Sequence, residues 1–317
     1  MFSQSLDKKK ALTYANEPVN ERSVKMRACP SSRTFTLVEL LVVIAIVGLL
    51  STIVLAVTSG VSEQGRIAKD LQFSQHLQNT LGADAVGIWS MDENPATQGA
   101  VIKDMSGWGN NGTLNTGETG VNKSVAGVMG QAISFDGVDD YINCGNDNSL
   151  NISGSITVGI WINPTLESGG DYPRAIIKER FVSGSDRGGF MVTVKDSGLV
   201  DFAILNNGYS QASTNVAKNE WTYLVGIHDV NRNLLEIYKN GELKHSIVPT
   251  VTIGDHASAS LKIGGTQYFK GSIDEVHIYN TALTSSQIKS QYYTGLDRLL
   301  TKGLIDEQEY RERLTLK

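Results

Sequence analysis

Hydrophobic and polar residues follow distinct patterns along the 317 residues of the chain. Residues 1–34 are polar and mixed in charge, with no period that would bury one face, which is typical of a targeting segment. An apolar run from Phe35 to Val57 follows, and Glu39 is the acidic residue within it. About 20 residues of this kind are enough for a helix to cross a bilayer. The pattern therefore predicts a targeting segment, or leader, over 1–34 and a transmembrane helix directly after it.

The predicted helix extends beyond the apolar run. Apolar residues recur at roughly helical spacing from Ile67 to Leu81, and no proline interrupts them. A helix over residues 35–82 would be roughly 70 Å long at 1.5 Å per residue. The hydrocarbon core of a bilayer is about 30 Å thick. About half of this helix is therefore expected to stand outside the membrane or to lie against a domain.

Residues 85–293 show the pattern of short strands. Residues 156–162 alternate between apolar and other side chains, and residues 221–227 do the same. Asn240 and Gly241 lie between two strand-like arms, which is the strongest local signal for a β-hairpin. Many short strands with few helices between them indicate an antiparallel sandwich or barrel. The fold class predicted for this region is therefore mainly β.

Residues 296–317 carry a separate helical pattern. Gly303 is expected to end a first short helix, and Asp306 with Glu309 three residues later offers an N-cap for a second. The segment resembles the short SHOCT-like helical module at the C-terminus of many bacterial proteins. A charged amphipathic tail is the alternative.

Composition and charge narrow the picture. With 32 glycines, 6 prolines and 40% hydrophobic residues, the chain is expected to fold into a turn-rich globular domain. The leader holds seven basic and three acidic residues, so the positive-inside rule places it in the cytoplasm and the remainder outside. Without the leader, the net charge changes from −5 to −9. An acidic mature protein argues against nucleic acid as a partner, because nucleic acid binds a basic face.

The start of the apolar run resembles a known processing motif. Arg33-Thr34-Phe35-Thr36-Leu37-Val38-Glu39-Leu40 is similar to the motif of type IV pilins and pseudopilins. In that family a prepilin peptidase cuts directly before the phenylalanine and methylates it, which implies cleavage between Thr34 and Phe35 here. The family usually has glycine at the position of Thr34. The resemblance also implies that Glu39 acts in assembly with other subunits. A plain signal-anchor, with Glu39 at the headgroup level, is the alternative.

The region 85–293 resembles a laminin-G-like, concanavalin A-type jelly roll. This fold hosts lectins, adhesion modules and hydrolases alike, so it does not by itself define an activity. The matching segments follow one another in continuous order: residues 86–93, 104–114, 133–142, 156–164, 220–225, 238–241 and 271–280.

Catalysis is not expected. A glucan hydrolase of this fold needs two carboxylates on one face of a strand, which in a strand requires a spacing of two residues. The Glu-x-Asp-x-Glu type of spacing is absent from the predicted strands. Asp139 and Asp140 are adjacent, as are Asp274 and Glu275, so the side chains of each pair point to opposite faces.

Two acidic residues form a candidate calcium site. Asp274 shares strand parity with Val276 and Ile278, so its carboxylate is expected to point inward, where it must be paired or bind a metal. The jelly-roll resemblance implies that Asp92 lies on a neighbouring strand. Two inward carboxylates could share a calcium ion with backbone carbonyls, because calcium is bound by oxygen ligands. The alternative is that each accepts backbone hydrogen bonds. Weaker candidates of the same kind are Asp104, Asp136 and Asp139.

Aromatic residues in predicted loops could form a platform for a sugar. Loops carry binding residues disproportionately, although a single loop aromatic often packs on its own loop. The candidates for ligand binding are Trp108, Tyr172, Tyr209 and Tyr268.

The combined prediction is a prepilin-like subunit of a type IV pilus or pseudopilus. Its jelly-roll head would be displayed for adhesion or for contact with a glycan or protein. Expected partners are the prepilin peptidase, other pilin or pseudopilin subunits and the membrane. The precursor would span the cytoplasmic membrane once, and the mature protein would reach the cell surface or a filament. The alternative is a membrane-anchored carbohydrate- or protein-binding domain that does not polymerise.

Overall fold

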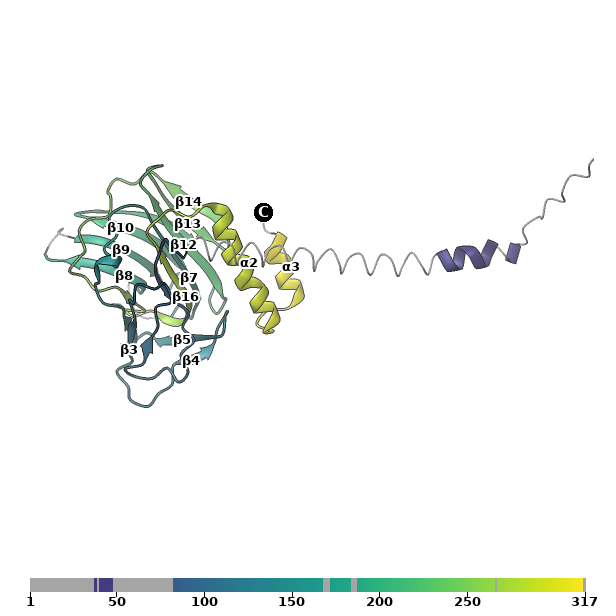
Figure 1. Cartoon of the computed structure of the whole chain (residues 1–317), viewed down its shortest axis with the longest axis horizontal. Helices are drawn as coiled ribbons and strands as arrows, with labels where there is room; N and C mark the ends of the chain where they lie inside the picture. Colours follow the sequence, from purple (N-terminus) through teal and green to yellow (C-terminus); the bar gives the residue numbers. More distant parts are fainter. Residues whose placement is uncertain are drawn as a thin grey trace, which may run out of the picture. The chain divides into compact units, whose positions relative to one another are not determined.

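The computed structural model describes residues 37–38, 40–47, 82–167, 172–183, 187–265 and 267–315 (Figure 1). The chain divides into two compact units, Met1–Val61 and Ser62–Lys317. In the first unit, the described residues of 37–47 are helical and their side chains are exposed. None of the helices within the described residues combines the length and apolar character that a membrane crossing requires. The predicted sites at Thr34, Phe35 and Glu39 lie outside the described residues.

The second unit is built from two antiparallel sheets of eight strands each (Figure 1). The first sheet has the order β14-β13-β12-β7-β16-β5-β4, with β1 also paired to β16. Its strands are β1 (Ala85–Trp89), β4 (Ser124–Ala126), β5 (Gln131–Asp136), β7 (Ile156–Pro164), β12 (Thr222–Asp229), β13 (Leu234–Lys239), β14 (Glu242–Ile247) and β16 (Lys270–Tyr279).

The second sheet has the order β11-β10-β9-β8-β15-β6-β3-β2. A single 3-10 turn, η1 (Asn148–Leu150), follows β6 in the chain. The strands are β2 (Val101–Ile102), β3 (Gly112–Asn115), β6 (Tyr141–Asn143), β8 (Arg174–Phe181), β9 (Arg187–Val194), β10 (Leu199–Asn206), β11 (Tyr209–Asn215) and β15 (Lys262–Ile263). The predicted two-sheet antiparallel sandwich is confirmed.

Side-chain alternation divides the hydrophobic residues of β7 between two clusters. Ile156, Val158, Ile160 and Ile162 are buried in the main core between the sheets. Trp161 points the other way and belongs to a second buried cluster. The β12 strand pairs with β7 in register, so its odd-numbered residues join Trp161 on the outer face. The outer face of the first sheet is therefore buried as well.

Two helices close the chain, α2 (Ser285–Thr301) and α3 (Glu307–Thr315). As expected, Gly303 adopts a positive φ of 67° just after the first helix, where a glycine avoids the steric cost of that conformation. The backbone N–H of Glu309 donates to Asp306 Oδ1 at 2.8 Å, as the predicted N-cap requires. The first helix begins earlier than expected because Thr284 starts it with a capping box. The predicted boundary between residues 293 and 296 consequently falls inside α2.

The helices cover the outer face of the first sheet (Figure 1). The Trp161 ring lies 5.2 Å from the ring of Tyr223 and 5.8 Å from that of Tyr292 on α2, measured between centroids. A Cβ on Gly295 would lie only 2.3 Å from Cζ2 of Trp161, so glycine permits this close approach of the helix. Buried Arg313 on α3 donates to the Trp221 carbonyl oxygen at 2.9 Å. The helices are thus part of the folded β domain.

Candidate functional site

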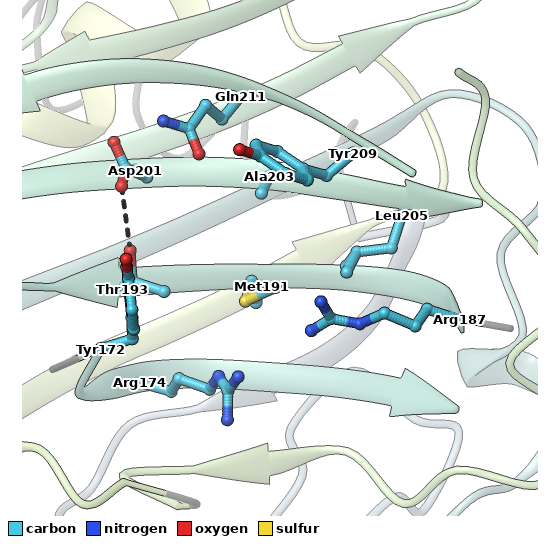
Figure 2. Close-up of a pocket in the computed structure, with 10 residues that line it drawn as sticks. All are labelled: Tyr172, Arg174, Arg187, Met191, Thr193, Asp201, Ala203, Leu205, Tyr209 and Gln211. Atoms are coloured by element: carbon cyan, nitrogen blue, oxygen red, sulfur yellow. Dashed lines mark hydrogen bonds between the residues drawn. The ribbon is translucent and has the colours of Figure 1, made fainter. Parts of the chain in front are cut away.

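The outer face of the second sheet carries a hollow of about 290 Å³ across β8, β9, β10 and β11 (Figure 2). Alternation along β10 explains how it forms, because Val200, Phe202 and Ile204 fill the main core and the residues between them face outward. The hollow is lined by Tyr172, Arg174, Arg187, Met191, Thr193, Asp201, Ala203, Leu205, Tyr209 and Gln211.

The floor of the hollow is apolar and its rim is aromatic. Met191, Ala203 and Leu205 form the buried floor. Tyr172 is 52% exposed and Tyr209 is 62% exposed. Tyr172 lies two residues before the start of β8 and Tyr209 begins β11, so the two rings come from opposite sides of the four-stranded segment (Figure 2).

Charged side chains lie at two places in the hollow. Arg187 contacts the Glu179 carboxylate at 2.5 Å, and a guanidinium nitrogen of Arg174 lies 3.8 Å from the same carboxylate. Burial and, to a smaller extent, the positive charge of Arg187 hold the pKa of Arg174 below its usual value, although the Glu179 carboxylate acts in the opposite direction. At the second place, Asp201 contacts the Lys195 ammonium at 2.9 Å and accepts a hydrogen bond from Ser213 Oγ at 2.6 Å.

The structure brings together two of the four aromatic residues proposed from the sequence. Tyr172 and Tyr209 both line the hollow. Tyr268 forms a β-bridge with Arg174, which places its backbone beside the hollow. Trp108 does not line the hollow and lies in the loop after β2, where it is 57% exposed.

Sequence reasoning missed the polar residues of the hollow. Thr193, Asp201 and Gln211 occupy outward positions on three adjacent strands. A polar residue at an outward position of an otherwise apolar strand is a signal that the sequence does contain. What the sequence does not give is the pairing of β9, β10 and β11 in a register that brings these residues together.

The loop that carries Trp108 is held rigidly. The Asp104 carboxylate accepts hydrogen bonds from the backbone N–H groups of Ile88, Ser106 and Asn110 at 2.8–3.0 Å. The role of Asp104 is therefore to order the loop through backbone hydrogen bonds.

Asp92 and Asp274 both bind backbone amides of one turn. Asp274 is fully buried, and its Oδ2 accepts a hydrogen bond from the N–H of Met129 at 3.0 Å. Asp92 Oδ1 accepts one from the N–H of Gln131 at 2.7 Å. The turn between β4 and β5 therefore engages both carboxylates that the sequence proposed as calcium ligands.

Burial makes Asp274 a source of pH-dependent stability. Desolvation, with a contribution from the charge of Glu275, raises its pKa to about 8 from 3.8. Between about pH 4 and pH 8, the carboxyl group of Asp274 stays protonated in the folded protein, whereas in the unfolded chain it is ionised. The stabilisation is complete below about pH 4 and is lost as the pH rises to about 8.

We expect the free energy of unfolding to fall by several kcal/mol between pH 4 and pH 8, since each unit by which the folded state raises the pKa corresponds to about 1.4 kcal/mol. Urea unfolding at several pH values measures this change. The side chain introduced by Asp274→Asn cannot ionise, so the free energy of unfolding of this variant should lack the fall between pH 4 and pH 8. Identical profiles for both proteins would contradict the assignment.

Within the described residues, the acidic group with a geometry that could hold a metal ion is Asp136, Asp139 and Asp140. One carboxylate oxygen from each lies within 4.8 Å of the others. Carboxylate oxygens are the ligands that calcium prefers. The Lys123 ammonium already lies 2.8 Å from Asp140 Oδ2 and 3.5 Å from Asp136 Oδ2. Lys123 thus supplies positive charge inside this group.

Family models match two parts of the chain. Residues 32–55 match the prokaryotic N-terminal methylation motif. Residues 136–289 match the model of the concanavalin A-like lectin/glucanases superfamily. A comparison with curated proteins gave no match.

Solved structures with the same fold include two botulinum neurotoxin domains. The receptor binding domain of mosaic serotype C/D is 14% identical with a TM-score of 0.54, and the match covers 68% of this chain and 52% of that one. The ligand binding domain of serotype D, in complex with N-acetylneuraminic acid, is 15% identical with a TM-score of 0.52, covering 69% and 53%. Domain 4 of an extracellular arabinanase from Geobacillus stearothermophilus, in complex with arabinotriose, is 22% identical with a TM-score of 0.49, covering 65% and 97%.

The present chain spans about half the length of the two neurotoxin domains, and identities this low establish the fold alone. The sandwich topology and the family match to residues 136–289 agree on this fold. The chain therefore combines a prokaryotic N-terminal methylation motif with a concanavalin A-like lectin/glucanase domain of the laminin G type.

Proposed function

We propose that the protein is a pilin-like subunit, which a prepilin peptidase cuts between Thr34 and Phe35 before it joins a type IV pilus or pseudopilus. The methylation motif over residues 32–55 supports this proposal. The basic leader and the apolar run that follows it have the character of a membrane-inserted precursor. In the mature subunit, the concanavalin A-like domain is the part displayed at the cell surface.

The displayed domain binds a glycan at the hollow on the second sheet. The combination of exposed Tyr172 and Tyr209 above an apolar floor is the observation that carries this proposal. Tyrosine rings offer a rigid apolar surface against which the C–H face of a pyranose ring can lie. Thr193, Asp201 and Gln211 supply a few polar groups around this surface, which is the usual composition of a small-ligand site.

The proposed activity is binding without hydrolysis. Glycoside hydrolysis uses two carboxyl groups, about 5–9.5 Å apart, on the two sides of the scissile bond. Among the described residues that line the hollow, Asp201 is the one with a carboxylate. That carboxylate is already engaged by Lys195 and Ser213.

We expect Tyr209→Ala to weaken glycan binding by roughly tenfold or more, because truncating an aromatic residue that anchors a ligand typically costs more than 1 kcal/mol. A glycan array with the full-length protein in detergent micelles identifies bound sugars, and titration calorimetry then gives the affinity of each variant. Trp108→Ala is the matched control, because it removes an equally exposed aromatic outside the hollow. A loss of binding in Trp108→Ala and not in Tyr209→Ala would place the site elsewhere.

A further inference from the structure

We infer that the hollow selects sugars that carry a carboxylate over their neutral counterparts. This inference rests on the proposed glycan binding and specifies the class of ligand. Two arginines and one aspartate are the charged residues among the described lining residues. The charged groups directly behind them are Glu179, which contacts both arginines, and Lys195, which contacts Asp201. Positive charge exceeds negative charge by one among the lining residues alone, and also when Glu179 and Lys195 are included.

The excess positive charge lies on the β8 side of the hollow, where the side chains of Arg174 and Arg187 meet at Glu179. Both guanidinium groups contact the same carboxylate, that of Glu179. The Glu179 side chain is only 8% exposed, whereas that of Arg187 is 32% exposed. An incoming ligand therefore meets the guanidinium of Arg187, and the compensating carboxylate stays behind it. Figure 2 shows the Arg187 guanidinium directed over the floor of the hollow toward Met191.

Asp201 does not oppose an anionic ligand. Its carboxylate is balanced by the Lys195 ammonium at 2.9 Å and by the hydroxyl of Ser213 at 2.6 Å. The same ammonium lies 5.1 Å from the centroid of the Tyr172 ring, so a third cation borders the rim. The hollow is thus electrically neutral around Asp201 and positive around Arg187.

Held guanidinium groups are well suited to carboxylates. A guanidinium presents planar N–H donors that match the two oxygens of a carboxylate. The contact with Glu179 restrains Arg187 before the ligand arrives, which lowers the entropic cost of binding. A carboxylate substituent on a sugar held by one of the tyrosines would be the part of the ligand that binds Arg187. A sialic acid and a uronic acid both provide such a group.

The test measures the affinity of the full-length protein, in detergent micelles, for two matched pairs of probes. The pairs are 3′-sialyllactose with lactose, and trigalacturonate with its methyl ester. We expect the acidic member of at least one pair to bind about tenfold more tightly, and this ratio to fall as salt is added. Preference within the first pair alone identifies a sialic acid, and within the second alone a uronic acid.

Arg187→Gln should reduce the acidic-to-neutral affinity ratio to about one. Arg311→Gln, which removes an exposed arginine on α3, should leave the wild-type ratio. Thermal unfolding verifies that both variants are folded. Equal affinity for both members of each pair in the wild type, or an unchanged ratio in Arg187→Gln, would overturn the inference and leave sugar binding at the hollow intact. Binding to none of the four probes would instead contradict the proposed function together with the inference.

Discussion

Glu39→Ala is expected to be inserted and cut normally but to be missing from surface filaments. If the proposed function holds, Glu39 would pair with the α-amino group of Phe35 of the neighbouring subunit, as the resemblance to pilins implies. A carboxylate among packed apolar helices is tolerated where a positive group compensates it. Removing one partner of a buried pair costs about 3 to 5 kcal/mol, because the other charge is left uncompensated. A loss of this size at each subunit contact is sufficient to prevent assembly.

To measure this effect, filaments are sheared from wild-type and variant cells, and the amount of the subunit in them is determined. Intact mass of the membrane-bound protein verifies that residues 1–34 are removed in both. Glu63→Ala is the matched control, because it removes the same side chain outside the apolar run. Equal amounts of wild-type and Glu39→Ala subunit in filaments would favour the alternative of a membrane-anchored binding domain that does not polymerise.

Trp161→Ala is expected to destabilise the β domain by about 3 to 5 kcal/mol, the usual cost of truncating a large buried aromatic residue. Trp161 is 2% exposed and contacts the rings of Tyr223 and Tyr292. The substitution removes the stacking of Trp161 on Tyr292, which is one of the contacts between the first sheet and α2. The end of α2 should consequently become sensitive to protease at denaturant concentrations where the wild type resists.

Urea unfolding gives the free-energy difference, and limited proteolysis reports the release of α2. Trp108→Ala serves as the control because it removes the same side chain from an exposed position, where the expected change is within about 0.5 kcal/mol. A loss below 1 kcal/mol in Trp161→Ala would show that α2 is held mainly by its other contacts.

The elements that depend on local signals could be predicted from the sequence. The alternation of β7 predicts which of its residues enter the core, and the caps at Gly303 and Asp306 predict where the two helices meet. The start of α2 at Ser285 was missed, since the strand-rich region was extended over it. Local patterns also do not tell whether an outer sheet face is solvated, so the burial of Trp161 under α2 required the structure.

The hollow depends on pairing between strands far apart in the sequence. Tyr172 and Tyr209 were proposed as loop aromatics, but their meeting around one floor follows from the order β11-β10-β9-β8. The arginines were not proposed at all, because an arginine in a strand is an ordinary surface residue until its neighbours are known. Asp274 shows a different limit, because parity with Val276 and Ile278 predicts a carboxylate in the core between the sheets. The bulge between Asp274 and His277 instead places Asp274 opposite Trp161 on the outer face, where it is buried against the turn before β5.

The cover that α2 and α3 form over the first sheet has a consequence for valency. With that face buried, the proposed site on the opposite sheet would give each copy of the domain a point of attachment. A single contact of this kind would release its ligand readily. Repetition of the domain along a filament would convert such contacts into avidity, since each bound copy raises the effective concentration of its neighbours at the same surface. Attachment would then depend on the length of the filament, and a single subunit released from it would dissociate from the surface.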